Sequence, residues 1–307
     1  HVLDSFASPS PVIGSSYLYC QFGDYGTACV DIKKASLVWH NRSQRLNHEN
    51  GPGSSPVLWK DLLIFHCDGS DVQYVVALDR KTGEEVWRTD RSGEMNDNPE
   101  MKKSYGTPLV TSVGGRDVLL SPASDWLYGY DPKTGNELWK VKYGILGFSI
   151  VPRPVVVDEV AYISTSFMKT ELLALQLGPT ETTQPQILWR YKRSVPRMPS
   201  TLLVGDAVYL FSDKGIATCL DKVTGEARWT GRLGGSFSSS PILADGKIYV
   251  GNREGEMFVI KPGNELDILT KNDFDEAIMA SPAAIDNSLY VRTDKAMYRI
   301  EKTDAKQ

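Results

Sequence analysis

The sequence predicts an all-β fold, a β-propeller of four-stranded antiparallel blades. Three observations carry this prediction. A sequence repeat recurs at intervals of 40 to 52 residues, each copy contains short segments in which apolar and polar residues alternate, and no stretch has a sustained apolar stripe of helical period. Four short strands in a repeat of this length are typical of a propeller blade.

The repeat has two independent anchors. The first is the Pro of segments such as SSPILADGKIYV, which recurs at Pro11, Pro56, Pro108, Pro154, Thr201 (in place of Pro), Pro241 and Pro282. The second is a Trp that follows in step, at Trp39, Trp87, Trp139, Trp189 and Trp229. Seven copies predict one domain over residues 1–307 with seven blades, or eight if a blade precedes the first residue. The seventh copy ends without a fourth strand, and we expect residues 1–7 to complete it.

The sixth copy shows the elements expected in each blade. PILA, KIYVGN, EMFVIK and LDILTK are four short β-type segments, separated by turns rich in Gly, Asp and Asn. We call the four strands of a blade A, B, C and D in chain order.

The stretch DRKTGEEVW (79–87) recurs as DPKTGNELW (131–139) and DKVTGEARW (221–229). We assign it to the C–D turn: Asp79 ends strand C, Gly83 takes a positive φ, and Trp87 on strand D fills the space between neighbouring blades. The first copy, DIKKASLVW, has Ala35 at the Gly position, which predicts a different or strained turn. The motif is therefore expected to be structural, and we assign no catalytic residue.

Composition excludes several classes. The net charge of −4 argues against a nucleic-acid-binding protein, and no apolar run reaches the roughly 18 residues of a membrane span. The four Cys include Cys20 and Cys29, which could face each other in a hairpin; we favour four unpaired thiols.

The combination of D-x-x-T-G-x-x-x-W with S-P-x-x-x-x-x-x-x-Y-V resembles the pyrroloquinoline-quinone-like, or quinoprotein-type, propeller repeat, over about residues 8–300. The family includes quinone-dependent alcohol dehydrogenases and a lipoprotein propeller of outer-membrane assembly, which binds proteins and catalyses no reaction. The resemblance implies an exported protein, in the periplasm or at the cell surface.

The candidate site follows from loop length. Long, non-repeating D–A loops cover residues 40–53, 88–105 and 190–199, and the B–C loops also diverge. These loops share one face of a blade, so we expect function on this D–A/B–C face and at the mouth of the central channel. The insertion LGPTETTQPQ (177–186) lies on the opposite, A–B/C–D face.

Several residues on the D–A/B–C face are candidate ligand-binding residues. Arg153 replaces the Ser or Thr found before the other anchors, and either meets an anionic ligand or pairs with Asp68, Asp71 or Asp213. The neighbours His48 and Glu49 are either a ligand or acid–base pair or a hydrogen-bonded loop staple. Tyr105 ends the second long loop. Lys169, Arg193 and Lys214 either form a basic patch with Arg153 or are simply solvated. The dispersed His residues predict no metal site.

Two functions fit this fold. The favoured one is a non-catalytic, monomeric scaffold that binds a protein, peptide or carbohydrate and needs no cofactor. The alternative is an alcohol-dehydrogenase-like enzyme, for which the resemblance implies pyrroloquinoline quinone and Ca²⁺. The sequence lacks the adjacent Cys pair of the large enzymes of that family, and five of its seven Trp occupy the repeat position.

Overall fold

A computed structural model describes residues 8–48, 51–144, 148–178, 180 and 183–301. The chain divides into two compact units, one of His1–Lys169 with Ala174–Leu188 and one of Thr170–Leu173 with Trp189–Gln307. We call them unit 1 and unit 2 and describe each by itself. Glu49 and the proposed closing segment 1–7 lie outside the described residues, as does any strand that residues 1–7 would form.

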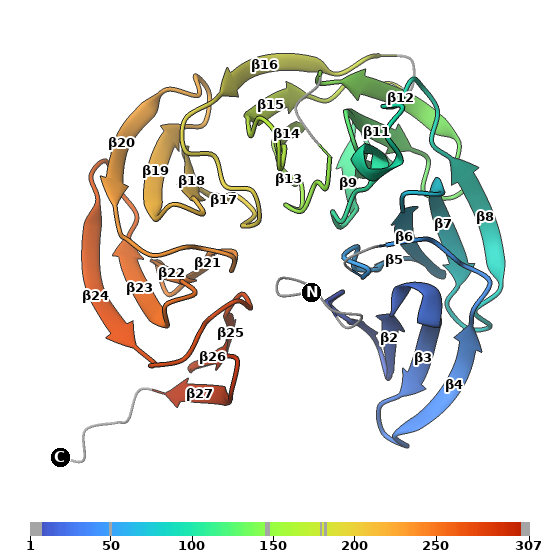
Figure 1. Ribbon diagram of the computed structural model, residues 1–307, viewed down its shortest axis with the longest axis horizontal. Helices are drawn as coiled ribbons and strands as arrows, with labels where there is room; N and C mark the ends of the chain where they lie inside the picture. Colours follow the sequence, from blue (N-terminus) through green and yellow to red (C-terminus); the bar gives the residue numbers. More distant parts are fainter. Residues whose placement is uncertain (1–7, 49–50, 145–147, 179, 181–182, 302–307) are drawn as a thin grey trace. The chain divides into compact units, whose positions relative to one another are not determined.

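Unit 1 contains three four-stranded antiparallel sheets, each a simple meander in chain order, and the start of a fourth (Figure 1). Its strands are β1 (Val12–Gly14), β2 (Tyr17–Gln21), β3 (Thr27–Asp31), β4 (Ser36–Asn41), β5 (Val57–Trp59), β6 (Leu62–Asp68), β7 (Gln73–Asp79), β8 (Glu85–Asp90), β9 (Leu109–Val113), β10 (Arg116–Pro122), β11 (Trp126–Tyr130), β12 (Glu137–Lys142), β13 (Val155–Val157) and β14 (Val160–Ser164). Strands β15 (Leu172–Gln176) and β16 (Gln186–Tyr191) complete the fourth sheet.

Unit 2 continues the pattern with two more four-stranded sheets and a last sheet of three described strands. Its strands are β17 (Leu202–Val204), β18 (Ala207–Phe211), β19 (Ile216–Asp221), β20 (Ala227–Arg232), β21 (Ile242–Ala244), β22 (Lys247–Gly251), β23 (Glu256–Lys261), β24 (Asp267–Asp273), β25 (Ala283–Ile285), β26 (Ser288–Arg292) and β27 (Met297–Glu301).

The prediction of an all-β propeller with seven blades is confirmed. The described helices are two 3₁₀ turns, η1 (Gly23–Tyr25) and η2 (Pro99–Lys102). No helix among the described residues is long and apolar enough to cross a membrane. All four Cys are free thiols, as expected.

The core lies between successive sheets. Along β6, Leu63 and Phe65 pack with Tyr19 of the first sheet, whereas Ile64 packs with Leu119 of the third. Successive side chains of a strand point to opposite faces, so a central strand buried on both faces is apolar at every position. This explains the unbroken apolar run at the start of β6.

The repeated C–D turn has the predicted structure. In the second sheet the Asp79 carboxylate accepts hydrogen bonds from the backbone N–H groups of Lys81 and Thr82, at 2.7 and 3.0 Å, and Gly83 has φ +76°. The Trp39 ring of the preceding sheet lies directly over Gly83, and its indole N–H donates to the Arg80 carbonyl at 2.9 Å. The Trp of one blade thus packs on the C–D turn of the next.

Ala35 has a φ of +48°, which an L-residue adopts only with strain. The strained turn that Ala35 predicts at this position is therefore present.

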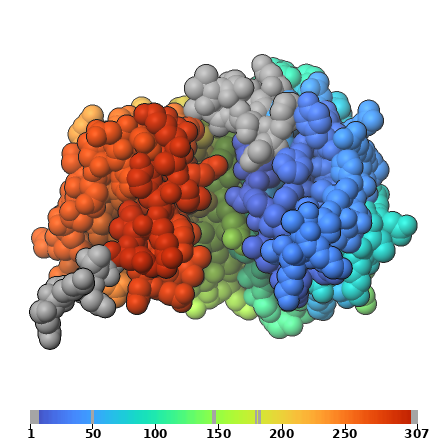
Figure 2. All heavy atoms as spheres, turned by 90° about the horizontal axis from the view of Figure 1, so that it is seen from below, coloured from blue at the N-terminus to red at the C-terminus, as the bar shows by residue number. Residues whose placement is uncertain are grey.

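The seventh sheet is the most exposed. Ile285 of β25 and Met297 of β27 are 58% and 65% exposed, and Figure 2 shows this red segment at the molecular surface. The described part of the sheet has only strands A, B and C, in agreement with the sequence.

Candidate functional site

In unit 1 the first long loop is fixed by His48. Its Nε2 lies 2.8 Å from the Asp68 carbonyl at the end of β6, and its Nδ1 lies 2.8 Å from the Gly51 carbonyl. The imidazole also meets the ring of Tyr105 edge-on, with centroids 5.0 Å apart. The structure therefore brings together three predicted residues, His48, Asp68 and Tyr105. The contacts of His48 are those of a hydrogen-bonded loop staple, one of the two alternatives given for it.

Asp71 acts within the same loop cluster. Its carboxylate accepts the backbone N–H groups of Asn47 at 2.7 Å and of Val72 at 3.0 Å. It therefore orders the B–C loop of the second sheet against the preceding D–A loop.

The second long loop begins at a buried Arg that sequence reasoning missed. Arg91 follows β8 and forms a two-pronged ion pair with Asp68, with Nε–Oδ1 and Nη2–Oδ2 distances of 3.1 and 2.8 Å. Its Nη1 donates to Ser121 of the third sheet at 2.6 Å, and the guanidinium lies 4.8 Å from the Tyr128 ring. Arg91 thus joins the D–A loop, the second sheet and the third.

The pairing decides the charge of this cluster. Burial opposes the charge on Arg91, but the adjacent Asp68 carboxylate, with smaller contributions from Tyr130 and Tyr128, raises the pKa of the guanidinium overall. Burial raises the pKa of Asp68, against the opposing charge and hydrogen bonds of Arg91, and the two-pronged geometry at 3.1 and 2.8 Å identifies Asp68 as the carboxylate partner of Arg91. It is not available to Arg153, which was one of the predicted pairings.

Ser121, His66 and Asp68 follow each other in the order of nucleophile, base and carboxylate. Ser121 Oγ lies 2.9 Å from His66 Nε2, and His66 Nδ1 lies 3.9 Å from Asp68 Oδ2. However, Ser121 is 0% and Asp68 only 1% exposed, and both are engaged by Arg91. A substrate has no path to such a hydroxyl, so the three residues serve as a structural anchor.

The B–C loop of the fourth sheet presents apolar side chains at the surface. Phe167 and Met168 are 36% and 48% exposed, and the Phe167 ring lies 6.5 Å from that of Phe148, in the loop between β12 and β13. Lys169 and Arg153, both predicted site residues, are exposed on this side of the fourth sheet. Partial desolvation of Arg153 by the surrounding protein lowers the pKa of its guanidinium.

Unit 2 contains the remaining predicted residues. Asp213, in the B–C loop of the fifth sheet, accepts the Arg197 backbone N–H at 3.2 Å, and its Oδ1 is buried without a hydrogen-bond partner in the described part of the chain. Desolvation raises the pKa of Asp213. Arg193 and Lys214 are exposed. The proposed basic patch is thus split between the units and stays a prediction.

The described residues do not fit a quinone and Ca²⁺ site. No group of three or more potential metal-ligating side chains occurs among them. Trp126, one of the two Trp outside the repeat position, donates its indole N–H to the Glu94 carbonyl at 2.9 Å, and Lys140 and Lys142 lie over its ring. It holds the second long loop and is not free to stack on a planar cofactor.

Comparison with known proteins identifies the family to which this architecture belongs. A family model described as "Outer membrane protein assembly factor BamB" matches residues 30–178 and 71–307. The chain belongs to this family. The BamB of Shewanella oneidensis is 30% identical over 162 residues, which cover 50% of this chain and 38% of that relative. The chain therefore spans well under half the length of this curated relative.

Two solved structures share the BamB-family fold of this chain. The crystal structure of BamB from Moraxella catarrhalis has a TM-score of 0.73 at 16% identity, over 94% of this chain and 83% of that one. A europium-containing methanol dehydrogenase has a TM-score of 0.72 at 11% identity, over 92% and 72%. At these identities both likenesses show the fold alone, so the residues of the chain must separate the two functions.

Proposed function

We propose that this BamB-family chain is a non-catalytic scaffold that binds proteins through its D–A/B–C face during outer-membrane protein assembly. Membership of the family supports this function, because the relatives are named as assembly factors. We further propose an exported, periplasmic protein that acts as a monomer without a cofactor. A protein is favoured over a carbohydrate or a free peptide as the ligand.

The observation that carries the proposal is the combination of fixed loops and exposed apolar side chains on one face. His48 and Arg91 hold the long loops by contacts between partly or fully buried groups, so the loops are ordered before a partner arrives. Phe167 and Met168 project from the same face, and aromatic and Met side chains are enriched at protein interfaces. Phe167 has a φ of +50°, a strained conformation of the kind found at functional sites.

The dehydrogenase alternative lacks this support. Its cofactor would need oxygen ligands around Ca²⁺ and a planar stacking partner. Among the described residues the Asp68 carboxylate is paired with Arg91, and Trp126 is held by its hydrogen bond to the second long loop. We assign no catalytic step to this chain.

Site-specific photocrosslinking in the native host tests the proposal. Met168 is replaced by a photoreactive amino acid in the full-length protein, and Val223, an exposed apolar residue of a C–D turn on the other face, is replaced as the matched control. Crosslinks to proteins of outer-membrane assembly are expected from position 168 and not from position 223. Equal crosslinking from both positions, or none from position 168, would contradict the proposal.

Calorimetry with pyrroloquinoline quinone and Ca²⁺ tests the alternative separately. We expect no heat of binding at high micromolar quinone. Saturable binding would instead support the dehydrogenase.

A further inference from the structure

In unit 1 the residue before the anchor position links one sheet to the next. The Ser10 backbone N–H donates to the Ser55 hydroxyl at 2.9 Å, and the Ser55 N–H donates to the Thr107 hydroxyl at 3.3 Å. Each N–H therefore ends on the side chain that occupies the same position one repeat later. This accounts for the Ser or Thr found before six of the seven anchors.

Unit 2 contains the same bonds. The Ser200 N–H donates to the Ser240 hydroxyl and the Ser240 N–H to the Ser281 hydroxyl, both at 2.9 Å. All four bonds have one direction and one repeat offset, so the acceptor oxygen is a regular part of the scaffold. A repeat that lacks this oxygen leaves the N–H of the preceding repeat without its usual acceptor.

The series is interrupted after Thr107. The next residue at this position is Arg153, whose side chain carries no oxygen. The Thr107 N–H has no hydrogen-bond acceptor among the residues that the structure describes, although Thr107 is half-buried. A backbone donor without a partner costs free energy away from water. By the geometry of the other pairs, this N–H points to the place that a hydroxyl oxygen fills elsewhere.

The segments that carry Thr107 and Arg153 run side by side. Ser104 and Ile150 form a parallel bridge, and the Tyr105 N–H donates to the Ile150 carbonyl at 2.8 Å. Thr107 comes three residues after Ser104, and Arg153 comes three residues after Ile150. The same register therefore brings the two residues to neighbouring positions, directly before β9 and β13, which lie on the inner side of unit 1 (Figure 1).

Arg153 supplies a positive charge at the interruption. Its side chain is exposed, and a guanidinium has five N–H donors, so it can serve an anion in addition to its contacts within the protein. Partial desolvation disfavours the charged form of Arg153 and lowers its pKa. An anion beside the guanidinium would offset this unfavourable desolvation.

We propose that a carboxylate binds between Thr107 and Arg153. One of its oxygens takes the place of the missing hydroxyl and accepts the Thr107 N–H, and the other accepts from the Arg153 guanidinium. A carboxylate fits because its two oxygens can serve two donors at once, and because hydrogen bonds from a guanidinium to a carboxylate are strong.

Two sources carry this chemistry. Thr107 follows the second long loop, so the site lies on the D–A/B–C face, and an acidic side chain of a bound protein is the first source. This source rests on the function proposed above. The second source is a free small carboxylate, which does not depend on that function.

An NMR titration of the full chain with acetate, at constant ionic strength, tests the site. We expect a saturable shift of the Thr107 amide N–H with acetate and none with uncharged acetamide. The Ser55 amide is the internal control, because the Thr107 hydroxyl already accepts its N–H. Equal shifts of the two amides, or no saturable shift of Thr107, would overturn the proposal.

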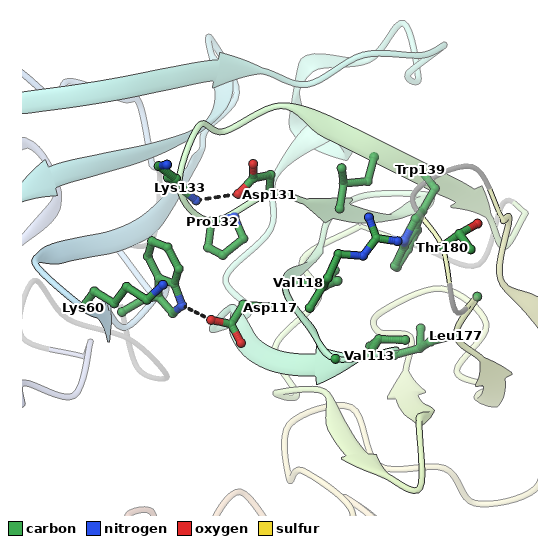
Figure 3. A pocket seen from close by; sticks show the side chains of 15 residues that line it. Lys60, Val113, Asp117, Val118, Asp131, Pro132, Lys133, Trp139, Leu177 and Thr180 are labelled. Carbon is green, nitrogen blue, oxygen red and sulfur yellow. Dashed lines mark hydrogen bonds between the residues drawn. The ribbon is translucent and has the colours of Figure 1, made fainter.

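Two variants of Arg153 separate charge from geometry. Arg153→Gln should weaken acetate binding at least tenfold, whereas Lys60→Gln should leave it unchanged. Lys60 is the control because it is an exposed cation of unit 1 at a cavity on the opposite, A–B/C–D face (Figure 3). Arg153→Ser restores the hydroxyl, so it should abolish the acetate response and slow hydrogen exchange of the Thr107 amide.

Two results from these variants contradict the site. The first is an acetate affinity that Arg153→Gln leaves unchanged. The second is a Thr107 amide that exchanges in the unmodified chain as slowly as the Ser55 amide, because its N–H would then already be paired. Melting temperatures that stay unchanged in Arg153→Gln and Lys60→Gln exclude unfolding as the cause of any loss.

Blocked peptides identify the source of the carboxylate. Tighter binding of Gly-Asp-Gly than of acetate, with no binding of Gly-Asn-Gly, indicates an acidic side chain of a protein. Binding of acetate without binding of Gly-Asp-Gly indicates a free carboxylate. These titrations contain no partner protein, so their failure is distinct from a failure of the crosslinking at position 168.

Discussion

Trp87 of the second sheet lies so close over Gly135 of the third that a Cβ on Gly135 would be 2.5 Å from the indole ring. A Cβ on Gly83 would lie at the same distance from the Trp39 ring, and one on Gly225 from the Trp189 ring. In each pair the Gly has a φ of +72° to +76° and the indole N–H donates to a carbonyl of the same turn. Two requirements, positive φ and space for a ring, thus fall on one residue.

The two requirements can be separated within the fifth sheet. Gly225→Ala introduces both the positive-φ strain and the clash with Trp189, and we expect it to lower the free energy of unfolding by more than about 2 kcal/mol. Gly205→Ala introduces only the strain, since nothing lies within 4 Å of its Cβ position, and should cost about 1 kcal/mol. Urea denaturation measures both, and equal costs would show that the ring contact is unimportant.

The first turn predicts a change of opposite sign. Ala35→Gly removes the backbone strain of an Ala held at φ +48°. We expect the free energy of unfolding to rise by up to about 1 kcal/mol, and the melting temperature to rise slightly with it. Differential scanning calorimetry measures this shift. A loss of stability would mean that packing of the Ala35 methyl group outweighs its backbone strain.

Removal of Arg91 should be among the most damaging single changes in unit 1. Arg91→Met leaves the Asp68 carboxylate buried and unpaired, which typically costs about 3–5 kcal/mol. Lys142→Ala, which breaks the exposed pair with Glu94, is the control and should cost less than about 1 kcal/mol. The unfolding free energies of both variants in urea check this. A cost for Arg91→Met as small as that of the control would contradict the role of the Arg91–Asp68 pair as a structural anchor.

The buried His66 predicts an acid sensitivity. Burial, and secondly the charge of Arg91, hold the pKa of His66 well below its usual value, so the folded protein keeps the ring neutral. The unfolded chain binds a proton below about pH 6.5, so stability falls as pH decreases through that value, by at most about 1.4 kcal/mol per pH unit. Unfolding free energies between pH 7.5 and 5.5 should show a shallower slope in His66→Gln. An unchanged slope would exclude His66 as the source.

The sequence was sufficient to predict the repeat, the strand order and the C–D turn. All three depend on local chemistry: the alternation of apolar and polar residues indicates a strand, and a Gly four residues before a Trp marks the turn. In the sixth sheet β23 coincides with its predicted segment, and β21, β22 and β24 differ from theirs by one or two residues at their ends.

The site was less predictable, because its contacts join residues far apart in the chain. His48 was singled out for its loop, but its partner, the Asp68 carbonyl, is a backbone group that no side-chain pattern reveals. Arg91 carried one signal that was missed: a charged residue directly after a D strand, where an exposed loop begins. Phe167 and Met168 were missed because exposure cannot be judged from a short B–C loop alone. The departure from the repeat at residues 177–186, part of which lines a cavity beside Trp139, is displayed by the sequence itself.

The contact between a Trp and the following turn has a direction, since the indoles of Trp39, Trp87 and Trp189 are covered by turns that come later in the chain. A ribosome releases Trp39 well before Gly83, and Trp87 well before Gly135. Each of these three blades therefore exposes one aromatic surface until the next turn emerges. Truncation has the same dependence on chain direction. Shortening from the C-terminal end uncovers an indole, whereas shortening from the N-terminal end uncovers only a glycine turn.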